Sequence, residues 1–219
     1  MTFHRVHIDI IPDLPDRFDL LFRSYSQIKG RMLTNLPLRL LLLLLVLTFV
    51  SGSSAATPPS SLVVSACAQA SYPSVCVRTL ATSSPSTPSD LALAATSASL
   101  SATRGAAAYL RHLTLPQAPS DRAAFRDCAN LLPDAADQLA RAAKELARLN
   151  PDTLRSQLGD AQTWASAAMT DQDMCLREIT GLSGRTRDAV VARVTEASHV
   201  TSNALYFITR VAATRDRNR

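Results

Sequence analysis

Residues 125–149 read FRDCANLLPDAADQLARAAKELARL, and their apolar residues recur at alternating intervals of three and four. The members of this stripe are Phe125, Cys128, Leu132, Ala135, Leu139, Ala142, Leu146 and Leu149. That spacing places all of them on one face of an α-helix, with charged residues on the outer face. Pro133 lies inside the stretch and predicts a local kink. The stretch therefore predicts an amphipathic helix that buries one face against other helices.

Three further stretches carry the same kind of stripe, over residues 91–113, 154–175 and 190–211. Gly105 interrupts the first of them and Gln172 the second. Alanine is frequent along the stripes, which predicts close helix packing. The links around 116–119, 150–151 and 181–184 are short. The sequence thus predicts an all-α fold, an antiparallel up-down four-helix bundle over residues 90–215.

The links also suggest where the helices begin. We expect Ser120 or Asp121 to cap the helix that starts after Pro119. Asn150 precedes Pro151, which predicts a capping side chain followed by proline at the first helical position.

The composition agrees with a helical fold. Hydrophobic residues make up 47% of the chain but aromatic residues only 5%, and there are six glycines. A β-sandwich would need more turn glycines and more β-branched or aromatic strand residues. Disorder is excluded because it requires low hydrophobicity and high net charge, whereas charged residues are 19% here.

The N-terminal part has the features of a secretion signal. Residues 40–50 read LLLLLLVLTFV, follow Arg39 and precede the small residues SGSSAAT. This apolar run is shorter than the roughly 20 residues that span a bilayer, so we predict a signal peptide over 32–56. Residues 1–31 are then a doubtful N-terminal extension, with Met32 as the start. The alternative is an uncleaved membrane anchor; a cleaved signal predicts a secreted protein, with no membrane contact in its mature form.

Four cysteines permit three disulfide pairings, and spacing alone does not choose among them. Cys67 and Cys76 flank Tyr72-Pro73 in residues 57–89, which we interpret as a short helical hairpin and a Ser/Thr/Pro-rich linker. Their separation of nine residues favours a local disulfide. Cys128 and Cys175 lie on stripes of successive antiparallel helices at the same end of the bundle, which favours pairing them. Free buried cysteines are the alternative, which an oxidising compartment disfavours.

No group of residues in the sequence supports catalysis. Glu196-x-x-His199 has the spacing of half a di-iron site, but the second copy and the further carboxylates are missing. We therefore expect neither metal nor cofactor. Arg185, Arg187 and Arg193 make the last helix basic without aromatic partners for base stacking, which excludes nucleic acid. We expect a solvated face there; weak contact with an anionic polysaccharide such as pectin is the alternative. These features favour a binding protein rather than an enzyme.

Four segments together resemble the plant invertase and pectin methylesterase inhibitor family. They are CAQASYPSVC at 67–76, FRDCANLLPDAADQL at 125–139, WASAAMT at 164–170 before Cys175, and TSNAL at 201–205. The resemblance covers nearly all of residues 62–211, in the family's order. It implies the pairings Cys67–Cys76 and Cys128–Cys175, and one inhibitor domain over 57–215.

The resemblance also implies a function. Pectin methylesterase inhibitors of this family lay bundle helices over the enzyme's active-site cleft, so we expect a stoichiometric inhibitor in the plant cell wall, the apoplast. Invertase inhibitors insert a Pro-Lys-Phe segment that this sequence lacks, which makes acid invertase the alternative target. A non-inhibitory secreted interaction module is the second alternative. The predicted partner contacts lie on the second and third bundle helices: Asp137, Arg141, Gln157, Asp160 and Gln162.

Overall fold

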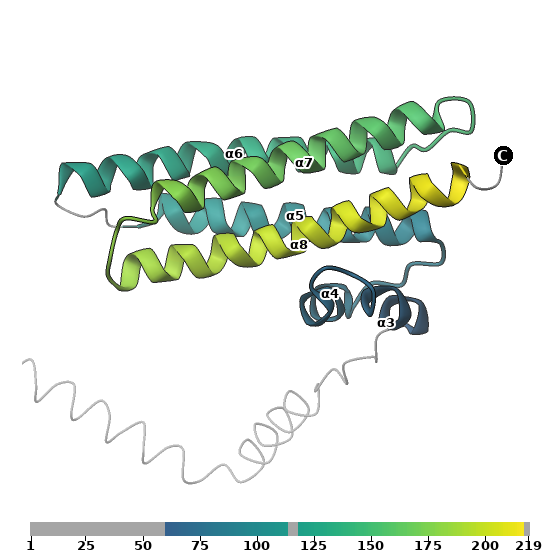
Figure 1. The fold of residues 1–219 in the computed structure, drawn as a ribbon, viewed down its shortest axis with the longest axis horizontal. Helices are drawn as coiled ribbons and strands as arrows, with labels where there is room; N and C mark the ends of the chain where they lie inside the picture. Colours follow the sequence, from purple (N-terminus) through teal and green to yellow (C-terminus); the bar gives the residue numbers. More distant parts are fainter. Residues whose placement is uncertain (1–59, 114–117, 217–219) are drawn as a thin grey trace, which may run out of the picture. The chain divides into compact units, whose positions relative to one another are not determined.

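The computed structural model describes residues 60–113 and 118–216, and over these ranges the chain is helical without any strand (Figure 1). Two short helices come first, α3 (Ser61–Cys67) and α4 (Pro73–Leu80). Four long helices follow: α5 (Pro88–Arg111), α6 (Pro119–Leu146), α7 (Leu154–Glu178) and α8 (Arg185–Asp216). The all-α prediction is confirmed. The predicted extension 1–31 and signal peptide 32–56 lie outside the described residues.

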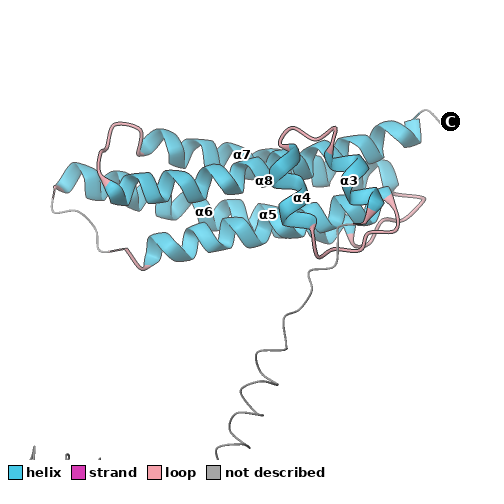
Figure 2. Ribbon diagram, turned by 90° about the horizontal axis from the view of Figure 1, so that it is seen from below, coloured by secondary structure: helices cyan, strands magenta, loops and turns pink. Residues whose placement is uncertain are grey.

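The four long helices form two antiparallel pairs, α5 with α8 and α6 with α7 (Figures 1 and 2). Each pair also packs on the other, through α5 against α6 and α7 against α8. The hairpin of α3 and α4 lies against the α5–α8 pair, on the side away from α6 and α7. Within the two described ranges, every helix is too short or too polar to cross a bilayer.

The predicted stripes form the core. Every stripe residue that lies in α6 is buried, and Leu149, which follows the end of the helix, is half-buried. Fully buried alanines of α6 and α7, including Ala135, Ala142 and Ala165, allow these helices to approach closely. Larger side chains such as Phe125, Leu132 and Ile179 fill the space between the pairs.

Buried polar side chains join α5 to two other helices. The hydroxyl oxygens of Ser99 on α5 and Thr201 on α8 are 2.6 Å apart, and both are buried. Gln172 of α7 does not interrupt the core as its polarity suggested; it is fully buried, and its Nε2 donates to Thr103 Oγ1 of α5 at 2.8 Å. Because a buried polar group without a partner is costly, these pairs favour one register of the helices over shifted ones.

The predictions of helix starts were less accurate. Ala118, not Ser120 or Asp121, is the N-cap of α6, and Pro119 occupies its first turn, where its fixed φ suits the helix. The helix then continues across Pro133, whose side chain is exposed.

The predicted start of α7 was also wrong. Thr153 is the N-cap, and Pro151 lies in a turn where Asn150 Oδ1 accepts from the Asp152 N–H at 3.0 Å.

The Ser/Thr/Pro-rich linker between the hairpin and the bundle is shorter than predicted, because α5 begins at Pro88. A reciprocal capping box between Thr87 and Asp90 fixes that start.

Candidate functional site

The predicted contact residues lie on α6 and α7, two helices that several interactions fasten together. Cys128 of α6 and Cys175 of α7 form a disulfide with their Cα atoms 4.2 Å apart. Further along the same seam, polar side chains of the two helices contact each other. We call the outward side chains along this seam the α6–α7 surface: Asp134, Asp137, Gln138 and Arg141 of α6 with Asp160, Trp164 and Asp171 of α7.

Arg141 and Trp164 form the aromatic part of the α6–α7 surface. The Arg141 guanidinium carbon lies 4.8 Å from the centroid of the Trp164 ring, a cation–π contact between the helices. Trp164 is the chain's single tryptophan and is half-buried. Asp137 is one turn before Arg141 on α6 and Asp160 one turn before Trp164 on α7, and both carboxylates are exposed. This part of the surface therefore combines one aromatic ring, one cation and two anions.

A second polar contact crosses the seam nearer the disulfide. Gln138 Nε2 donates to Asp171 Oδ2 at 3.0 Å. Burial raises the pKa of the Asp171 carboxyl, the hydrogen bond from Gln138 opposes that rise, and the nearby Asp134 charge adds to it. Gln138 Oε1 is buried and has no hydrogen-bond partner among the described residues. The carboxyl of Asp171 is therefore easier to protonate than an exposed aspartate.

The structure separates the two predicted glutamines from this group. Gln157 Oε1 accepts from the Asn150 N–H at 2.8 Å and from Thr153 Oγ1 at 3.1 Å, and its Nε2 donates to the Arg148 carbonyl at 2.7 Å. Gln157 thus organises the turn between α6 and α7. Gln162 lies on the other flank of α7, where its Nε2 is 3.4 Å from Thr209 Oγ1 of α8.

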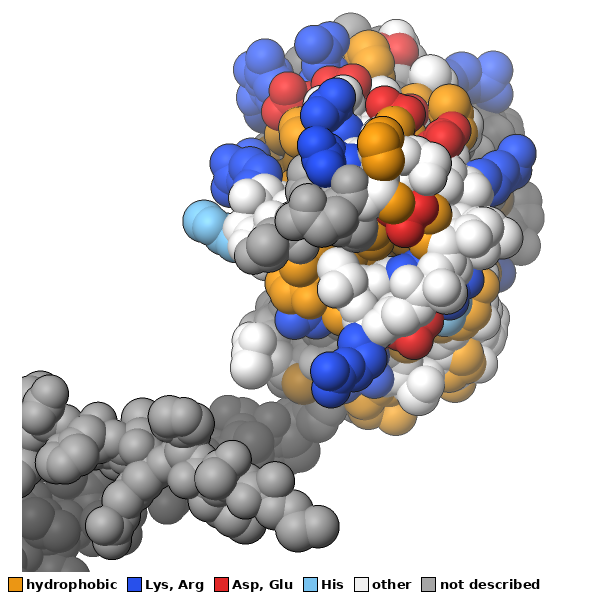
Figure 3. All heavy atoms as spheres, turned by 90° about the vertical axis from the view of Figure 1, so that its left-hand side faces the viewer, with side chains coloured by type: hydrophobic (Ala, Val, Ile, Leu, Met, Phe, Trp, Pro, Cys, Tyr) orange, Lys and Arg blue, Asp and Glu red, His pale blue; other side chains and the backbone are white. Residues whose placement is uncertain are grey.

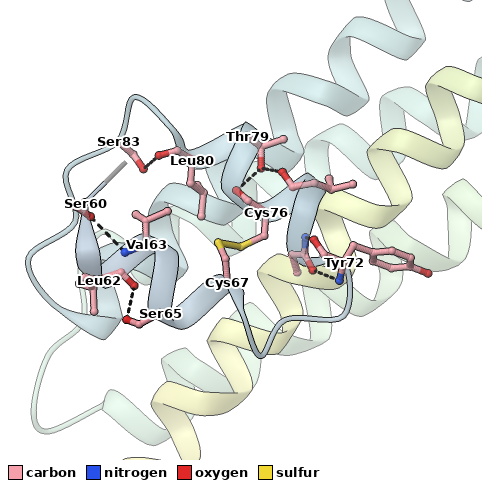
Figure 4. Close-up of a disulfide and its surroundings, with 12 residues drawn as sticks. Ser60, Leu62, Val63, Ser65, Cys67, Tyr72, Cys76, Thr79, Leu80 and Ser83 are labelled. Carbon is pink, nitrogen blue, oxygen red and sulfur yellow. Dashed lines mark hydrogen bonds between the residues drawn. A yellow bond between two sulfur atoms is a disulfide. The ribbon is translucent and has the colours of Figure 1, made fainter. Parts of the chain in front are cut away.

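The TSNAL segment of α8 fastens the N-terminal hairpin to the bundle. Asn203 Oδ1 accepts from the Tyr72 N–H at 2.9 Å, and Asn203 Nδ2 donates to the Tyr72 carbonyl at 3.0 Å. Tyr72 lies in the turn that the Cys67–Cys76 disulfide closes, as Figure 4 shows. One side chain of α8 therefore satisfies both backbone polar groups of a residue 131 positions earlier. This role of Asn203 was not predicted from the sequence, although Asn203 lies in TSNAL, one of the four segments singled out there.

Two residues considered above for a metal site also fasten the hairpin. The His199 ring stacks on Tyr72 with ring centroids 3.7 Å apart, and Glu196 forms an ion pair with Arg78 of α4. Among the residues that the structure describes, no group of three or more His, Cys, Asp or Glu side chains is placed to hold a metal ion.

Comparisons with known proteins agree with this architecture. A family model described as plant invertase/pectin methylesterase inhibitor matches residues 61–207. Pectinesterase inhibitor 3 of Arabidopsis thaliana is 39% identical over 165 residues, covering 70% of this chain and 80% of that protein. Pectinesterase inhibitor 9 of the same plant is 32% identical over 180 residues, covering 74% and 88%.

One solved structure shares the fold. It is the crystal structure of mutant form A of a pectin methylesterase inhibitor from Arabidopsis, with a TM-score of 0.55 and 20% identity over 68% of this chain and 97% of that one. The two sequence relatives are named as inhibitors, which agrees with the prediction that this protein is not an enzyme. The chain belongs to the plant invertase/pectin methylesterase inhibitor family.

Proposed function

We propose that this protein inhibits a pectin methylesterase by placing the α6–α7 surface across the enzyme's active-site cleft. One inhibitor would then occlude one enzyme and so regulate the de-esterification of cell-wall pectin. The observation that carries this proposal is the 39% identity to Pectinesterase inhibitor 3 over 80% of that protein's length.

The rigidity of the α6–α7 surface supports occlusion as the mechanism. The Cys128–Cys175 disulfide, the Arg141–Trp164 contact and the Gln138–Asp171 hydrogen bond all hold α6 against α7. A surface ordered before binding loses little conformational entropy when it docks, which favours tight association. Arginine and tryptophan are also enriched among residues that dominate binding energy.

Within this surface we propose Asp137, Arg141 and Asp160 as the central contacts. Gln157 and Gln162 would lie at its edges, since hydrogen bonds hold Gln157 in the turn and direct Gln162 toward α8. Their part in binding would therefore be smaller.

A titration tests the proposed target. The full chain is expressed through a yeast secretory pathway, purified from the medium and titrated against one pectin methylesterase and one acid invertase. With the enzyme well above the dissociation constant, esterase activity should fall linearly and reach zero near one equivalent, while invertase activity is unchanged. Inhibition of invertase alone would identify the alternative target, and inhibition of neither would indicate a non-inhibitory interaction module.

Charge reversal tests the proposed surface. Asp137→Lys and Asp160→Lys should each weaken esterase inhibition at least about tenfold, because a reversed charge opposes complementary groups on the partner. Asp188→Lys is the matched control, since Asp188 is an exposed carboxylate at the start of α8, away from the α6–α7 seam. Equal effects of all three substitutions would show that the surface is wrongly chosen.

We also propose that residues 32–56 direct secretion to the apoplast, that residues 57–215 form the inhibitor domain, and that residues 1–31 are not translated. N-terminal sequencing of the secreted protein should then find a start near Thr57. Recovery of the uncleaved chain in the membrane fraction would instead support an anchor.

Weak contact with pectin is proposed for one end of the bundle. Figure 3 views that end, where Lys and Arg side chains lie among acidic ones. Part of this positive charge is already engaged, since Arg187 pairs with Asp188 at 3.1 Å and Arg193 lies 4.0 Å from the Tyr109 ring centroid. We therefore expect retention on immobilised polygalacturonate only at low ionic strength. Retention that survives about 0.3 M salt would contradict a weak, screened contact.

A further inference from the structure

A groove opens between the hairpin and the bundle, on the side of the molecule away from α6 and α7. We call it the hairpin groove; α3, the start of α5 and the C-terminal part of α8 line its volume of about 260 Å³. It exists because α4 packs closely on α5 and α8, whereas α3 packs mainly on α4. Figure 4 shows Val63 on the inner side of α3, with Leu62 and Ser65 on other sides of the helix. Leu62 and Ser65 contribute to the groove wall.

The floor of the hairpin groove is apolar and partly aromatic. Leu91 of α5 and Phe207 of α8 lie at its base and are buried, with 3% and 4% exposure. Leu62 and Ala66 of α3 and the Tyr206 ring of α8 complete the apolar walls. Such walls favour a flat apolar group, because burying it removes apolar surface from water on both sides.

The rim of the groove carries hydrogen-bond donors of positive or neutral charge. Arg210 of α8 is exposed, and its guanidinium carbon is 5.9 Å from the Tyr206 ring centroid. Gln69, in the turn after α3, is exposed and also lines the groove. No acidic side chain is among the described residues that line the groove. The rim thus attracts an anion, and a guanidinium binds a carboxylate through two parallel hydrogen bonds.

We propose that the hairpin groove binds a small aromatic carboxylate, with its ring on the apolar floor and its carboxylate at Arg210. A cavity of about 150 Å³ accepts benzene, so the larger hairpin groove has room for one ring with a short carboxylate arm. The binding site is separate from the α6–α7 surface and does not depend on esterase inhibition.

Cinnamate and its uncharged analogue cinnamamide provide a matched pair of probes. The full chain, secreted and purified as above, is titrated with each compound and followed by ¹H–¹⁵N NMR spectra. We expect saturable cinnamate binding with a dissociation constant of about 1 mM or tighter. Shifts should concentrate in α3 and in the C-terminal part of α8, and cinnamamide should bind at least about tenfold more weakly.

Three variants test the assignment of the groove. Arg210→Gln should lower cinnamate affinity to that of cinnamamide, while esterase inhibition stays at the wild-type level. Arg104→Gln, which changes an exposed arginine of α5 outside the groove, should change neither. Ala66→Leu should fill the groove and weaken both compounds.

Several results would overturn the proposal. They are equal affinity for the two compounds, an equal effect of Arg104→Gln and Arg210→Gln, or no saturable binding to the wild type. The last would indicate that another part of the chain, or another molecule, occupies the groove. Because Arg210 is exposed, Arg210→Gln is expected to fold, and it keeps the test decisive even if Ala66→Leu does not.

Discussion

Replacing Asn203 by alanine should weaken the attachment of the hairpin to the bundle. The substitution removes two hydrogen bonds, to the N–H and the carbonyl of Tyr72, made by a side chain that is 2% exposed. Each such bond contributes a net of about 0.5–1.5 kcal/mol. We therefore expect the free energy of unfolding to fall by about 2 kcal/mol in urea denaturation. For a domain of this size, the melting temperature should fall by roughly 4–8 °C.

The location of the effect is as informative as its size. The Cys67–Cys76 disulfide keeps α3 and α4 joined, so the hairpin should detach as one unit. Amide hydrogen exchange should therefore accelerate over residues 61–80 much more than in the cores of α6 and α7.

Two further variants serve as controls. Asn203→Asp keeps the acceptor for the Tyr72 N–H but places a buried carboxylate oxygen against the Tyr72 carbonyl, so we expect a loss of stability at least as large as that of Asn203→Ala. Ser202→Ala, at the half-buried neighbouring position, should change little. The reasoning is refuted if Asn203→Ala stays within about 0.5 kcal/mol of the wild type, or if exchange accelerates uniformly through the bundle.

Three other predictions concern the bundle. Gln172→Leu should raise the free energy of unfolding by up to about 1 kcal/mol. The reason is that Gln172 Oε1 has no partner among the described residues, while Thr103 keeps its bond to the Ser99 carbonyl. A clear loss of stability in urea denaturation would contradict this prediction. Burial raises the pKa of Asp171, so the folded state binds this proton more tightly than the unfolded chain. Asp171→Asn should therefore gain stability relative to the wild type as the pH rises above the ordinary value of 3.8, and a difference that does not vary with pH would argue against it. Replacing both Cys128 and Cys175 by alanine should lower the free energy of unfolding by about 4 kcal/mol, because the disulfide closes a loop of 47 residues. Calorimetry of this variant, with the Cys67–Cys76 disulfide intact, measures the loss, and an unchanged melting temperature would disprove the prediction.

The helices and their buried faces could be predicted because the periodicity of apolar residues records burial along one element. Phe125 and Leu139 reveal their face by spacing alone. Helix starts are harder, since several residues can cap one helix and only the chain path selects among them. The helix α6 begins at Pro119, before both of the predicted caps. At α7, the bond between Asn150 and Asp152 used the asparagine in a turn instead.

The roles of polar residues depend on partners far away in the sequence. Gln172 looks like an interruption until Thr103, 69 residues earlier, is placed beside it. Asn203 and His199 likewise acquire a role only when Tyr72 reaches α8. The predicted partner contacts stay a prediction: Arg141 contacts Trp164, one turn after Asp160, whereas Gln157 and Gln162 bond to other neighbours.

The bond between Tyr72 and Asn203 also constrains the order of assembly during synthesis. The ribosome delivers the hairpin first, and its anchoring residue only 131 positions later. The disulfide between Cys67 and Cys76 spans nine residues and can close early, so it preserves the turn while the rest of the chain emerges. Docking of the hairpin must then wait for the last helix. In a nascent chain truncated before Asn203, the apolar face of the N-terminal hairpin is therefore still accessible to chaperones.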